Sequence, residues 1–399
     1  MRIAYVCADP GIPVFGQKGC SIHVQEVIRA LRHQGATVEL FAVRWGDDPP
    51  ADLADVPCHA MPSVPKGDLA LRETAALANN DHLRTALERA EPFDAVYERY
   101  SLWSYGAMDF AQAQGIAALL EVNAPLIEEQ AQHRGLIQHE AARRVAERVF
   151  RRATTIIAVS DEVKQYLTGW VEGERMRVVP NGVNHRRFAG SPSSMPTSVT
   201  ELRSSTFTVG FVGSLKPWHG LSHLVNAFDQ LHQRVPEARL LIVGDGPERD
   251  TLEVQLVERQ LQSVTRCTGA VPPDRIPDLL AEMDVAVAPY PASPDFYFSP
   301  LKVVEYMAAG LPVVVSDIGQ LRHLVKNNVT GLRCPPGDEN ALALALERLW
   351  RSPDLRYALG RSARQHILAH HTWDGVAEQI LAIVNPPPVG CIHAAMHRS

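Results

Sequence analysis

The sequence predicts an α/β protein of two domains, each built on a doubly wound parallel sheet. Three observations predict this class. The chain has 399 residues, more than one hydrophobic core usually supports. Short β-rich runs alternate with longer amphipathic segments, as in βαβ units. The alternation stops once, over the Ser-, Thr- and Pro-rich residues 187–206, and then resumes, so this stretch is predicted to link two domains.

The first domain is expected to span residues 1–186. Its predicted strands read RIAYVCA, TVELFAV, DAVYER, AALLEV, TTIIAVS and RVVP. The segment SIHVQEVIRALRHQG between the first two is a predicted helix, and Gly35 ends it. The stretch HRGLIQHEAARRVAERVFRRA is also predicted to be helical. Strands joined by such helices form a parallel sheet.

The second domain is expected to span residues 207–369. Its predicted strands read TVGFVGS, RLLIVGDG, VTRCTGA, DVAVAPY and PVVVSD, and LVNAFDQLHQRV, ERDTLEVQLVERQL and IPDLLAEM are predicted helices between them. Residues 370–385 contain a further helix, TWDGVAEQILAIV. Open α/β sheets bind ligands beyond the carboxyl ends of their strands, so we expect the site in a cleft where the two domains face each other.

Composition excludes several classes of protein. The net charge of −6 offers little to a phosphate backbone, so no nucleic-acid partner is expected. The six cysteines show no CxxC spacing, which favours reduced thiols in a cytoplasmic protein and no metal site. No run approaches the length of a transmembrane helix, and the N-terminus lacks the pattern of a signal peptide. We expect a monomer or dimer.

Several predicted strand-to-helix turns are rich in glycine or small residues, where a backbone can approach a phosphate: FGQKGCS, VGSLKPWHG, VGDGPE and FSPLK. In the last turn, the amides of Leu301 and Lys302 and the Lys302 ammonium can hold a diphosphate. Glu305 lies one turn deeper and can accept hydrogen bonds from two ribose hydroxyls. The alternative is that Glu305 is solvated or paired with a surface Arg.

Other catalytic motifs are missing from the sequence. VGDGPERD lacks the third glycine of a dinucleotide fingerprint, and there is no Walker Gly-Lys-Ser/Thr. No G-x-S-x-G elbow or HExxH helix occurs, which disfavours a hydrolase or a metalloprotease.

Nearly the whole chain resembles the retaining nucleotide-sugar glycosyltransferases of family 4, which have the two-domain GT-B fold. The matching segments occur in the family's order: KGCSIHVQEVIRALRHQGATVEL, TTIIAVSDEV, VVPNGVNHRRF, VGSLKPWHG, LIVGDGPE and FSPLKVVEYMAAGLPVVVSDIG. The resemblance implies transfer from a nucleoside-diphosphate sugar, a UDP- or GDP-sugar, to a small-molecule or glycan acceptor, without a cofactor or metal. It also implies that helix 370–385 returns to the first domain, which binds the acceptor.

The resemblance also implies roles for individual residues. The donor-binding set is Gly19, Gly213, Ser214, Lys216, His219, Gly244, Val271, Ser299, Pro300, Leu301, Lys302 and Glu305, with Glu305 on the ribose and the amides of Leu301 and Lys302 on the phosphates. The acceptor-side set is His23, Glu98, Arg99 and Asn123. The catalytic set is Asn123, Lys216 and Asp295.

The chain departs from the family pattern at four places. Either Asp295 or Tyr297 replaces the first residue of the family's acidic pair. In the phosphate loop, Ser214 and His219 replace an Arg and a Lys. In the first loop, Lys18 replaces a glycine, and after the strand AALLEV, Asn123 replaces a His. Lys216 then remains as a fixed cation of the phosphate loop, and we predict that Lys216, not His219, carries its charge.

Less specific interpretations stay open for these residues. Asn123 can cap the segment that follows it, Lys216 and Lys302 can be solvated, and Glu98 can pair with Arg99. Trp103 and Tyr105 are expected to pack in the core rather than bind sugar. For the whole chain, the alternative function is a sugar-nucleotide-binding pseudoenzyme. An epimerase or phosphorylase is disfavoured because the sequence has no motif for a Lys-bound cofactor.

Overall fold

The computed structural model describes residues 1–188, 206–293, 296–297 and 299–385. The predicted linker 187–206 therefore lies almost entirely outside the described residues, as does Asp295. The chain divides into two compact units, Met1–Asn181 with Trp373–Ser399, and Gly182–Thr372. Residues 182–186, predicted as the end of the first domain, lie in the second unit. There the Val183 amide donates a hydrogen bond to the His371 carbonyl.

The first unit contains a seven-stranded sheet in the order β3-β2-β1-β4-β5-β6-β7, and its strand pairs are parallel. In its register, Ile3 on β1 lies between Val38 on β2 and Ala95 on β4. The strands are β1 Arg2–Cys7, β2 Thr37–Ala42, β3 Cys58–Ala60, β4 Ala95–Arg99, β5 Ala117–Val122, β6 Thr155–Ala158 and β7 Met176–Val178.

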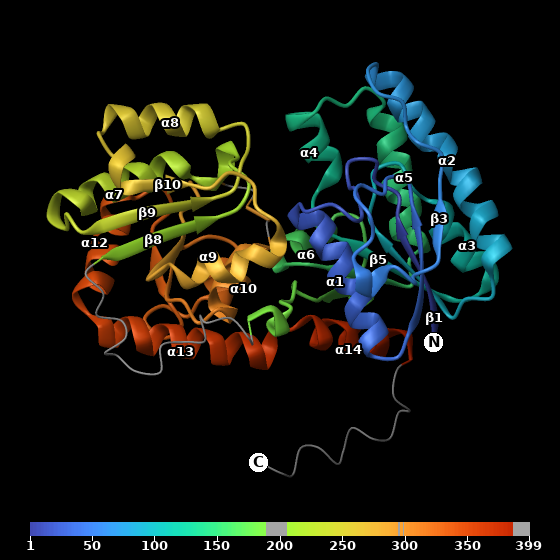
Figure 1. The fold of residues 1–399 in the computed structure, drawn as a ribbon. Coiled ribbons are helices and arrows are strands. Elements are labelled where there is room, and N and C mark those ends of the chain that lie inside the picture. The colour runs from blue at the N-terminus through green and yellow to red at the C-terminus, as the bar shows by residue number, and fades with distance from the viewer. Residues whose placement is uncertain (189–205, 294–295, 298, 386–399) are drawn as a thin grey trace, which may run out of the picture. The chain divides into compact units, whose positions relative to one another are not determined.

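Helices connect these strands and cover the sheet (Figure 1). They are α1 Gly19–His33, α2 Leu69–Ala90, α3 Gly106–Gln114, α4 Leu126–His133, α5 His139–Arg152, α6 Asp161–Leu167 and α14 Trp373–Val384, with short 3-10 turns at Ala51–Leu53 and Gly173–Arg175. The prediction of one helix from His133 to Ala153 is wrong for the first third of that segment. Gly135 has a positive φ of 80°, which interrupts a helix, and α5 begins only at His139.

The C-terminal helix α14 belongs to the first unit, where it packs against α1. The edge of the His23 ring lies against Trp373, with 5.2 Å between the ring centroids. At the other end of α1, His33 Nδ1 lies 3.4 Å from Asp374 Oδ1. One face of α14 is apolar, and this face needs another element to cover it. Its buried residues are Trp373, Val376, Ala377 and Ile380.

The second unit contains a six-stranded parallel sheet in the order β10-β9-β8-β11-β12-β13. The strands are β8 Phe207–Val212, β9 Ala238–Val243, β10 Thr265–Cys267, β11 Val285–Ala288, β12 Val313–Ser316 and β13 Leu332–Cys334. The helices are α7 Leu221–Arg234, α8 Arg249–Glu258, α9 Ile276–Ala281, α10 Leu301–Ala308, α11 Leu321–Leu324, α12 Glu339–Arg351 and α13 Pro353–His370, with 3-10 turns at His185–Phe188, Pro217–His219, Gln262–Val264 and Pro273–Arg275.

Each face of the second sheet has its own apolar core. Leu240 and Ile242 of β9 point to the layer of α7, α8 and α12, whereas Leu241 and Val243 point to the layer of α9, α10 and α11. This alternation buries both faces of the strand, so its sequence reads as a continuous apolar run. The predicted class of two parallel α/β domains is confirmed.

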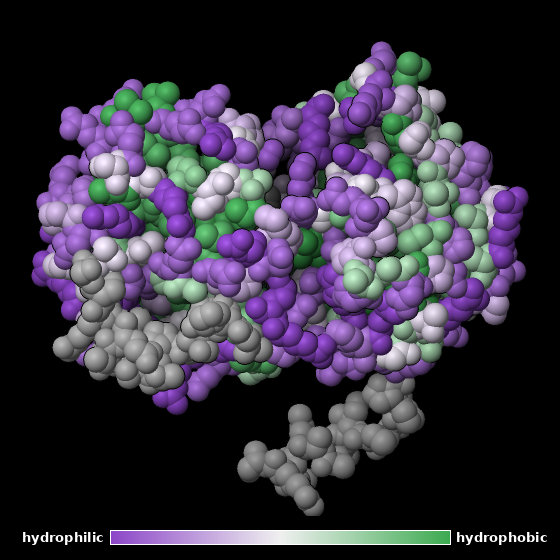
Figure 2. All heavy atoms as spheres, viewed as in Figure 1, coloured by the Kyte–Doolittle hydropathy of each residue, from purple (hydrophilic) through white to green (hydrophobic). Residues whose placement is uncertain are grey.

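Both sheets reverse their winding at one point, between β1 and β4 in the first unit and between β8 and β11 in the second. Loops diverge there at the carboxyl ends of the strands, which opens a crevice for ligands in such sheets. On the face drawn in Figure 2, apolar atoms gather over α8, where Val254 and Val257 are exposed. Among the described residues, no helix is long and apolar enough to cross a membrane.

Candidate functional site

The carboxyl edge of the second sheet brings together most of the predicted donor residues of that unit. Gly213 and Ser214 follow β8, Gly244 follows β9, Val271 follows β10, and the segment that begins α10 follows β11. Because these strands are parallel neighbours, their ends meet at one edge of the sheet.

Two glycines allow the backbones at this edge to approach closely. Gly213 has a φ of +146° and Gly244 a φ of +139°, both in the region that disfavours side chains. A Cβ atom at Gly244 would lie 2.0 Å from the Gly213 carbonyl oxygen. The turns are tied by the Gly213 amide, which donates to the Val243 carbonyl, and the Gly244 amide, which donates to the Gly269 carbonyl. The two turns therefore pack backbone against backbone, and the Gly213 turn lies beside Lys302 of α10.

Helix α10 is held at this edge by Tyr306. The Tyr306 hydroxyl accepts a hydrogen bond from the Val212 amide at 2.7 Å and donates to the Val212 carbonyl at 3.1 Å. The helix begins at Leu301, with Pro300 as its N-cap, and no side chain in the described part of the chain caps it. The Val303 amide donates to the Pro300 carbonyl. The amides of Leu301 and Lys302 lie at the start of the helix, where backbone donors have no acceptor within the helix and can face a ligand or water.

Lys302 places a buried cation at the Gly213 turn. Its Nζ atom lies 4.2 Å from the ring centroid of Phe211 and 5.6 Å from that of Tyr290. It would lie 2.8 Å from a Cβ atom at Gly213. The nitrogen is buried and has no hydrogen-bond partner among the described residues. Burial lowers the pKa of the Lys302 ammonium to about 7. The alternative of a solvated Lys302 is therefore wrong for its charged end.

His219 is held in its neutral form. Burial, then the nearby charges of Lys302 and Lys216, lower the pKa of His219 to about 3, although the Ser214 carbonyl opposes the shift. The His219 Nδ1 atom lies 2.5 Å from that carbonyl oxygen, so Nδ1 carries the proton and donates it. His219 is therefore uncharged at neutral pH while no ligand is bound.

Lys216 is half-buried in the same loop, and its Nζ atom lies 5.7 Å from the ring centroid of Trp218. Ser214 is exposed beside it. The loop thus presents one cation at its surface, and the buried Lys302 supplies a second cation from α10.

Glu305 is paired with an arginine. Arg187 donates from Nη1 to Glu305 Oε1 at 2.9 Å, and the two side chains are 20% and 22% exposed. The alternative interpretation of Glu305 as one half of an ion pair with an Arg is thus confirmed by this contact. A paired carboxylate is still able to accept further hydrogen bonds, because its two oxygens offer about four acceptor positions.

In the first unit, Gly19 is the exposed first residue of α1, and Lys18 is its N-cap. The four predicted acceptor-side residues lie in three different settings. His23 and Arg99 join Glu121: the His23 Nε2 atom lies 2.7 Å from Glu121 Oε1, and Arg99 Nη1 lies 3.1 Å from His23 Nδ1. Arg99 can only donate, so its guanidinium faces the Nδ1 atom of His23 as a donor, while Nε2 faces the Glu121 carboxylate. The His23 side chain is 4% exposed, and both its nitrogens are already engaged.

Glu98 does not pair with Arg99, and that interpretation is wrong. Neighbouring residues of a strand point to opposite faces, so the two side chains diverge. Glu98 is fully buried and accepts a hydrogen bond from the Ser104 hydroxyl, while its Oε2 atom has no partner among the described residues. Burial raises the pKa of Glu98 to about 7, against the effect of Ser104.

Asn123 follows β5 directly, at the carboxyl edge of the first sheet. Its Nδ2 atom is buried and has no hydrogen-bond partner in the described part of the chain. Within the described residues, Asn123 is thus a donor without a partner at the end of a strand.

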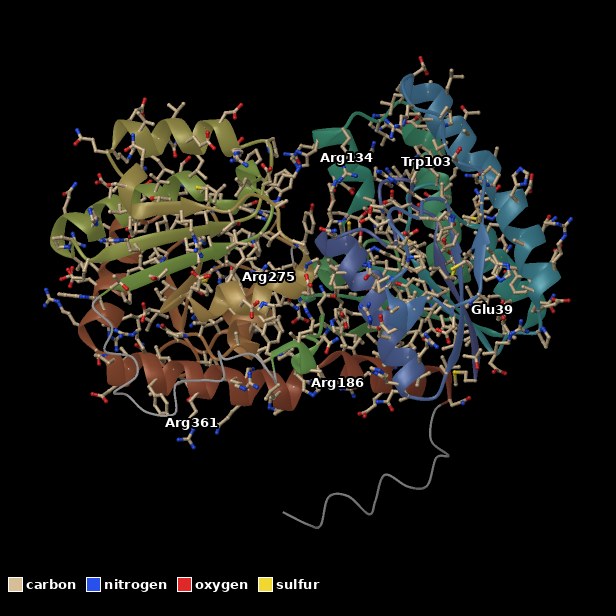
Figure 3. The ribbon with its side chains drawn as sticks, viewed as in Figure 1. Glu39, Trp103, Arg134, Arg186, Arg275 and Arg361 are labelled. Atoms are coloured by element: carbon tan, nitrogen blue, oxygen red, sulfur yellow. The ribbon has the colours of Figure 1, made fainter. Side chains whose placement is uncertain are left out.

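Two aromatic residues that follow β4 pack against other side chains. Trp103, which Figure 3 labels, belongs to a core cluster with Leu136 and Ala142, as expected. The guanidinium of Arg148 lies over the ring of Tyr105, 4.0 Å from its centroid.

Two family models match the chain and together span most of it. The model described as Glycosyltransferase Family 4 matches residues 18–187, and the model described as Glycosyl transferases group 1 matches residues 206–352. The chain belongs to the family 4 glycosyltransferases. The recognition made from the sequence segments is confirmed.

Individual relatives of this glycosyltransferase are distant. The glycogen synthase of Mycobacterium tuberculosis strain H37Rv is 26% identical over 294 residues, which are 71% of this chain and 66% of that protein. The match thus spans just under two thirds of that relative. Among solved structures, sucrose-phosphate synthase from Thermosynechococcus elongatus has a TM-score of 0.74 and 22% identity, and the match covers 96% of this chain and 98% of that one.

The Anabaena protein HepE, solved in complex with UDP and glucose, has a TM-score of 0.72 and 19% identity, and the match covers 97% of this chain and 100% of that one. These structural similarities establish the GT-B fold of the glycosyltransferase, with two α/β units.

Sequence reasoning missed several residues that build the edge of the second sheet. Arg187 fell in the predicted linker, and Phe211, Tyr290 and Tyr306 were counted as ordinary apolar residues of strands and helices. Glu121 was also missed, although a carboxylate inside the apolar strand AALLEV is a signal of a buried ion pair. Among the described residues, no group of three or more His, Cys, Asp or Glu side chains is arranged to hold a metal ion.

Proposed function

We propose that this glycosyltransferase moves a sugar from a UDP- or GDP-sugar to a small-molecule or glycan acceptor, with retention of configuration and without a metal or cofactor. The observation that carries the proposal is the Lys302 ammonium, which is buried without a partner beside the open N-terminus of α10. A buried cation is costly unless a ligand supplies the opposite charge, so this arrangement favours an anionic ligand at the turn.

The diphosphate is placed on the amides of Leu301 and Lys302, with the Lys302 ammonium against its oxygens. Lys216 adds charge from the loop after β8, and Glu305 accepts from the ribose hydroxyls one turn into the helix. Cleavage of the glycosidic bond leaves negative charge on the diphosphate, which these fixed donors stabilise. The complex of HepE with UDP and glucose supports the nucleotide assignment by similarity.

The acceptor is activated by the leaving group in this proposal. The departing phosphate takes the acceptor proton on the same face of the sugar, so no protein nucleophile is needed. The Asn123 amide, whose Nδ2 atom has no partner in the described residues, is proposed to donate to the sugar. Asp295 or Tyr297 takes the place of the family's first acid.

A binding protein without turnover is the second candidate. It is favoured by the neutral state of His219 at the position of the family's Lys, because one cation of the phosphate loop is lost. Lys302 compensates for this loss in the proposed enzyme.

Donor binding and turnover test the proposal directly. We expect micromolar to millimolar binding of one nucleoside diphosphate among UDP, GDP and ADP, and slow hydrolysis of its sugar conjugate in the presence of excess chelator. Calorimetry identifies the base, and release of nucleotide measures the turnover. Binding without turnover for any sugar conjugate or acceptor would support the pseudoenzyme, and loss of activity in chelator would reveal a metal requirement.

Donor affinity should depend on pH through Lys302. Its pKa is about 7 in the empty site, and a bound diphosphate raises it because the opposite charge favours the ammonium. Binding above about pH 7 therefore takes up as much as one proton, and affinity falls up to about ten-fold per pH unit. Lys216 alone would give a flat profile over this range.

The measurement is calorimetry of a nucleotide sugar, whose diphosphate does not titrate in this range, in two buffers of different ionisation enthalpy. The fall of donor affinity with rising pH should disappear in Lys302→Met and persist in His219→Gln. A slope that disappears in His219→Gln instead would assign the proton to the histidine.

A further inference from the structure

Arg187 joins two parts of the predicted donor site. Its Nη1 atom donates to Glu305 Oε1 on α10 at 2.9 Å, and its Nη2 atom donates to the carbonyl of Pro273. Pro273 begins the 3-10 turn Pro273–Arg275, just after Val271. One guanidinium thus connects the carboxylate proposed to bind ribose with the loop that follows Val271, a residue of the predicted donor-binding set.

The core of the second unit fixes the position of Arg187. The preceding Val183 forms a β-bridge with Thr372, and the following Phe188 is 4% exposed. Val183 and Phe188 belong to the same apolar cluster as Val303 and Val304 of α10. Two residues labelled in Figure 3 help to locate this contact. Arg186 precedes Arg187 in the chain, and Arg275 ends the 3-10 turn that begins at Pro273. The backbone that carries Arg187 is therefore anchored on both sides to this core.

The same cluster holds the loop on the other side of this connection. Val271 and Ile276, which flank the 3-10 turn, pack against it. The loop and α10 thus share a core, and Arg187 adds a polar connection between them at the edge. Because the Arg fork is planar and rigid, it sets the direction of the Glu305 carboxylate as well as its distance from Pro273.

This connection matters for a ribose because two vicinal hydroxyls need a carboxylate that is ionised and correctly turned. The guanidinium supplies the opposite charge beside Glu305 and occupies one acceptor position on Oε1. Loss of this contact leaves the Glu305 carboxylate less firmly held, so more side-chain entropy is lost when a ribose binds.

We propose that Arg187 is a positioning residue that makes the donor site selective for a ribonucleotide, by orienting Glu305 toward the ribose hydroxyls. This inference rests on the proposed function. Arg187 acts through Glu305, so its contribution depends on the presence of both the carboxylate and the hydroxyls.

The test compares a nucleoside diphosphate with its 2′,3′-dideoxy counterpart, using the base that the unmodified chain binds best. Arg187→Gln should weaken binding of the ribonucleotide by about ten-fold, and should change binding of the dideoxynucleotide by less than about two-fold. Arg187→Lys keeps the charge but loses the fork, so we expect an intermediate loss. Arg186→Gln is the matched control, because it removes an exposed neighbouring charge, and should preserve the selectivity.

A double-mutant cycle separates positioning from general damage. In a Glu305→Gln background, Arg187→Gln should have no further effect on ribonucleotide binding. Equal weakening of both ligands by Arg187→Gln and by Arg187→Lys, or additive effects in the cycle, would show a merely structural role and overturn the inference. Unchanged selectivity in a folded Arg187→Gln protein would overturn the inference alone. Failure of the unmodified chain to bind any nucleoside diphosphate would overturn the proposed function together with it.

Discussion

Replacement of Lys302 by Met should stabilise the protein in the absence of ligand and weaken donor binding at the same time. Folding lowers the pKa of Lys302 from 10.5 to about 7, so burial of the charged form destabilises the native state. This loss of folding stability is absent above the pKa of Lys302 in the unfolded chain. It grows as pH falls from 10.5 to about 7 and stays constant at lower pH. Met keeps an unbranched chain against the rings of Phe211 and Tyr290 without the charge.

We expect a gain of about 2–4 kcal/mol in the free energy of unfolding at neutral pH, and a loss of about 10- to 100-fold in diphosphate affinity. Chemical denaturation at neutral pH and near pH 10.5 measures the first effect, which should shrink at the higher pH. Lys216→Met is the matched control, since its partly exposed ammonium should give no gain in stability. A Lys302→Met protein that is less stable, or that binds the donor normally, would contradict the assignment.

Glu121→Gln should strongly destabilise the first unit. The Glu121 carboxylate is 3% exposed and lies 2.7 Å from His23 Nε2 and 4.0 Å from Arg99 Nη1. Removal of its charge leaves the guanidinium of Arg99, which is 11% exposed, without a counter-ion. Breaking a buried pair in this way costs about 3–5 kcal/mol.

The same carboxylate makes stability sensitive to acid. Burial raises the pKa of Glu121, but His23 and Arg99 lower it by more, so the net effect lowers it below its usual value of 4.5. Its contribution is therefore complete above pH 4.5 and is lost as pH falls through the lower folded-state pKa.

Urea unfolding followed by circular dichroism, at neutral pH and near pH 3, compares the Glu121→Gln protein with Glu88→Gln, which removes an exposed carboxylate of the same unit. The loss in Glu121→Gln should exceed that of the control by about 3 kcal/mol at neutral pH. Similar losses in both variants would exclude a buried ionic network.

The strands of both sheets could be predicted in large part because buried parallel strands are continuous apolar runs between helices. The two strands that escaped prediction, β3 Cys58–Ala60 and β13 Leu332–Cys334, lie at the edges of the two sheets and have three residues each. Such short edge strands pair because a neighbouring strand is already in place, and three residues carry no periodic signal. The edge strands β7 Met176–Val178 and β10 Thr265–Cys267 are equally short, but they were predicted as parts of longer β-rich runs.

The sequence by itself determined the spacing of Leu301, Lys302 and Glu305, because a helix converts intervals of one and four residues into neighbouring positions on its first turns. It likewise determined the glycines at the strand ends, since only glycine tolerates their backbone angles. These local features were sufficient to predict a phosphate-binding edge and to reveal the family.

Only the tertiary structure decided which charges at that edge are available. Glu305 meets Arg187 across 118 positions of the chain, and His23 on α1 meets Glu121 on β5. The pKa values of Lys302 and His219 move to about 7 and about 3 because folding removes their nitrogen atoms from water. Pairing and desolvation depend on groups that are distant in sequence, so no local pattern could have shown that Lys302 is unpaired, within the described residues, while His219 stays neutral.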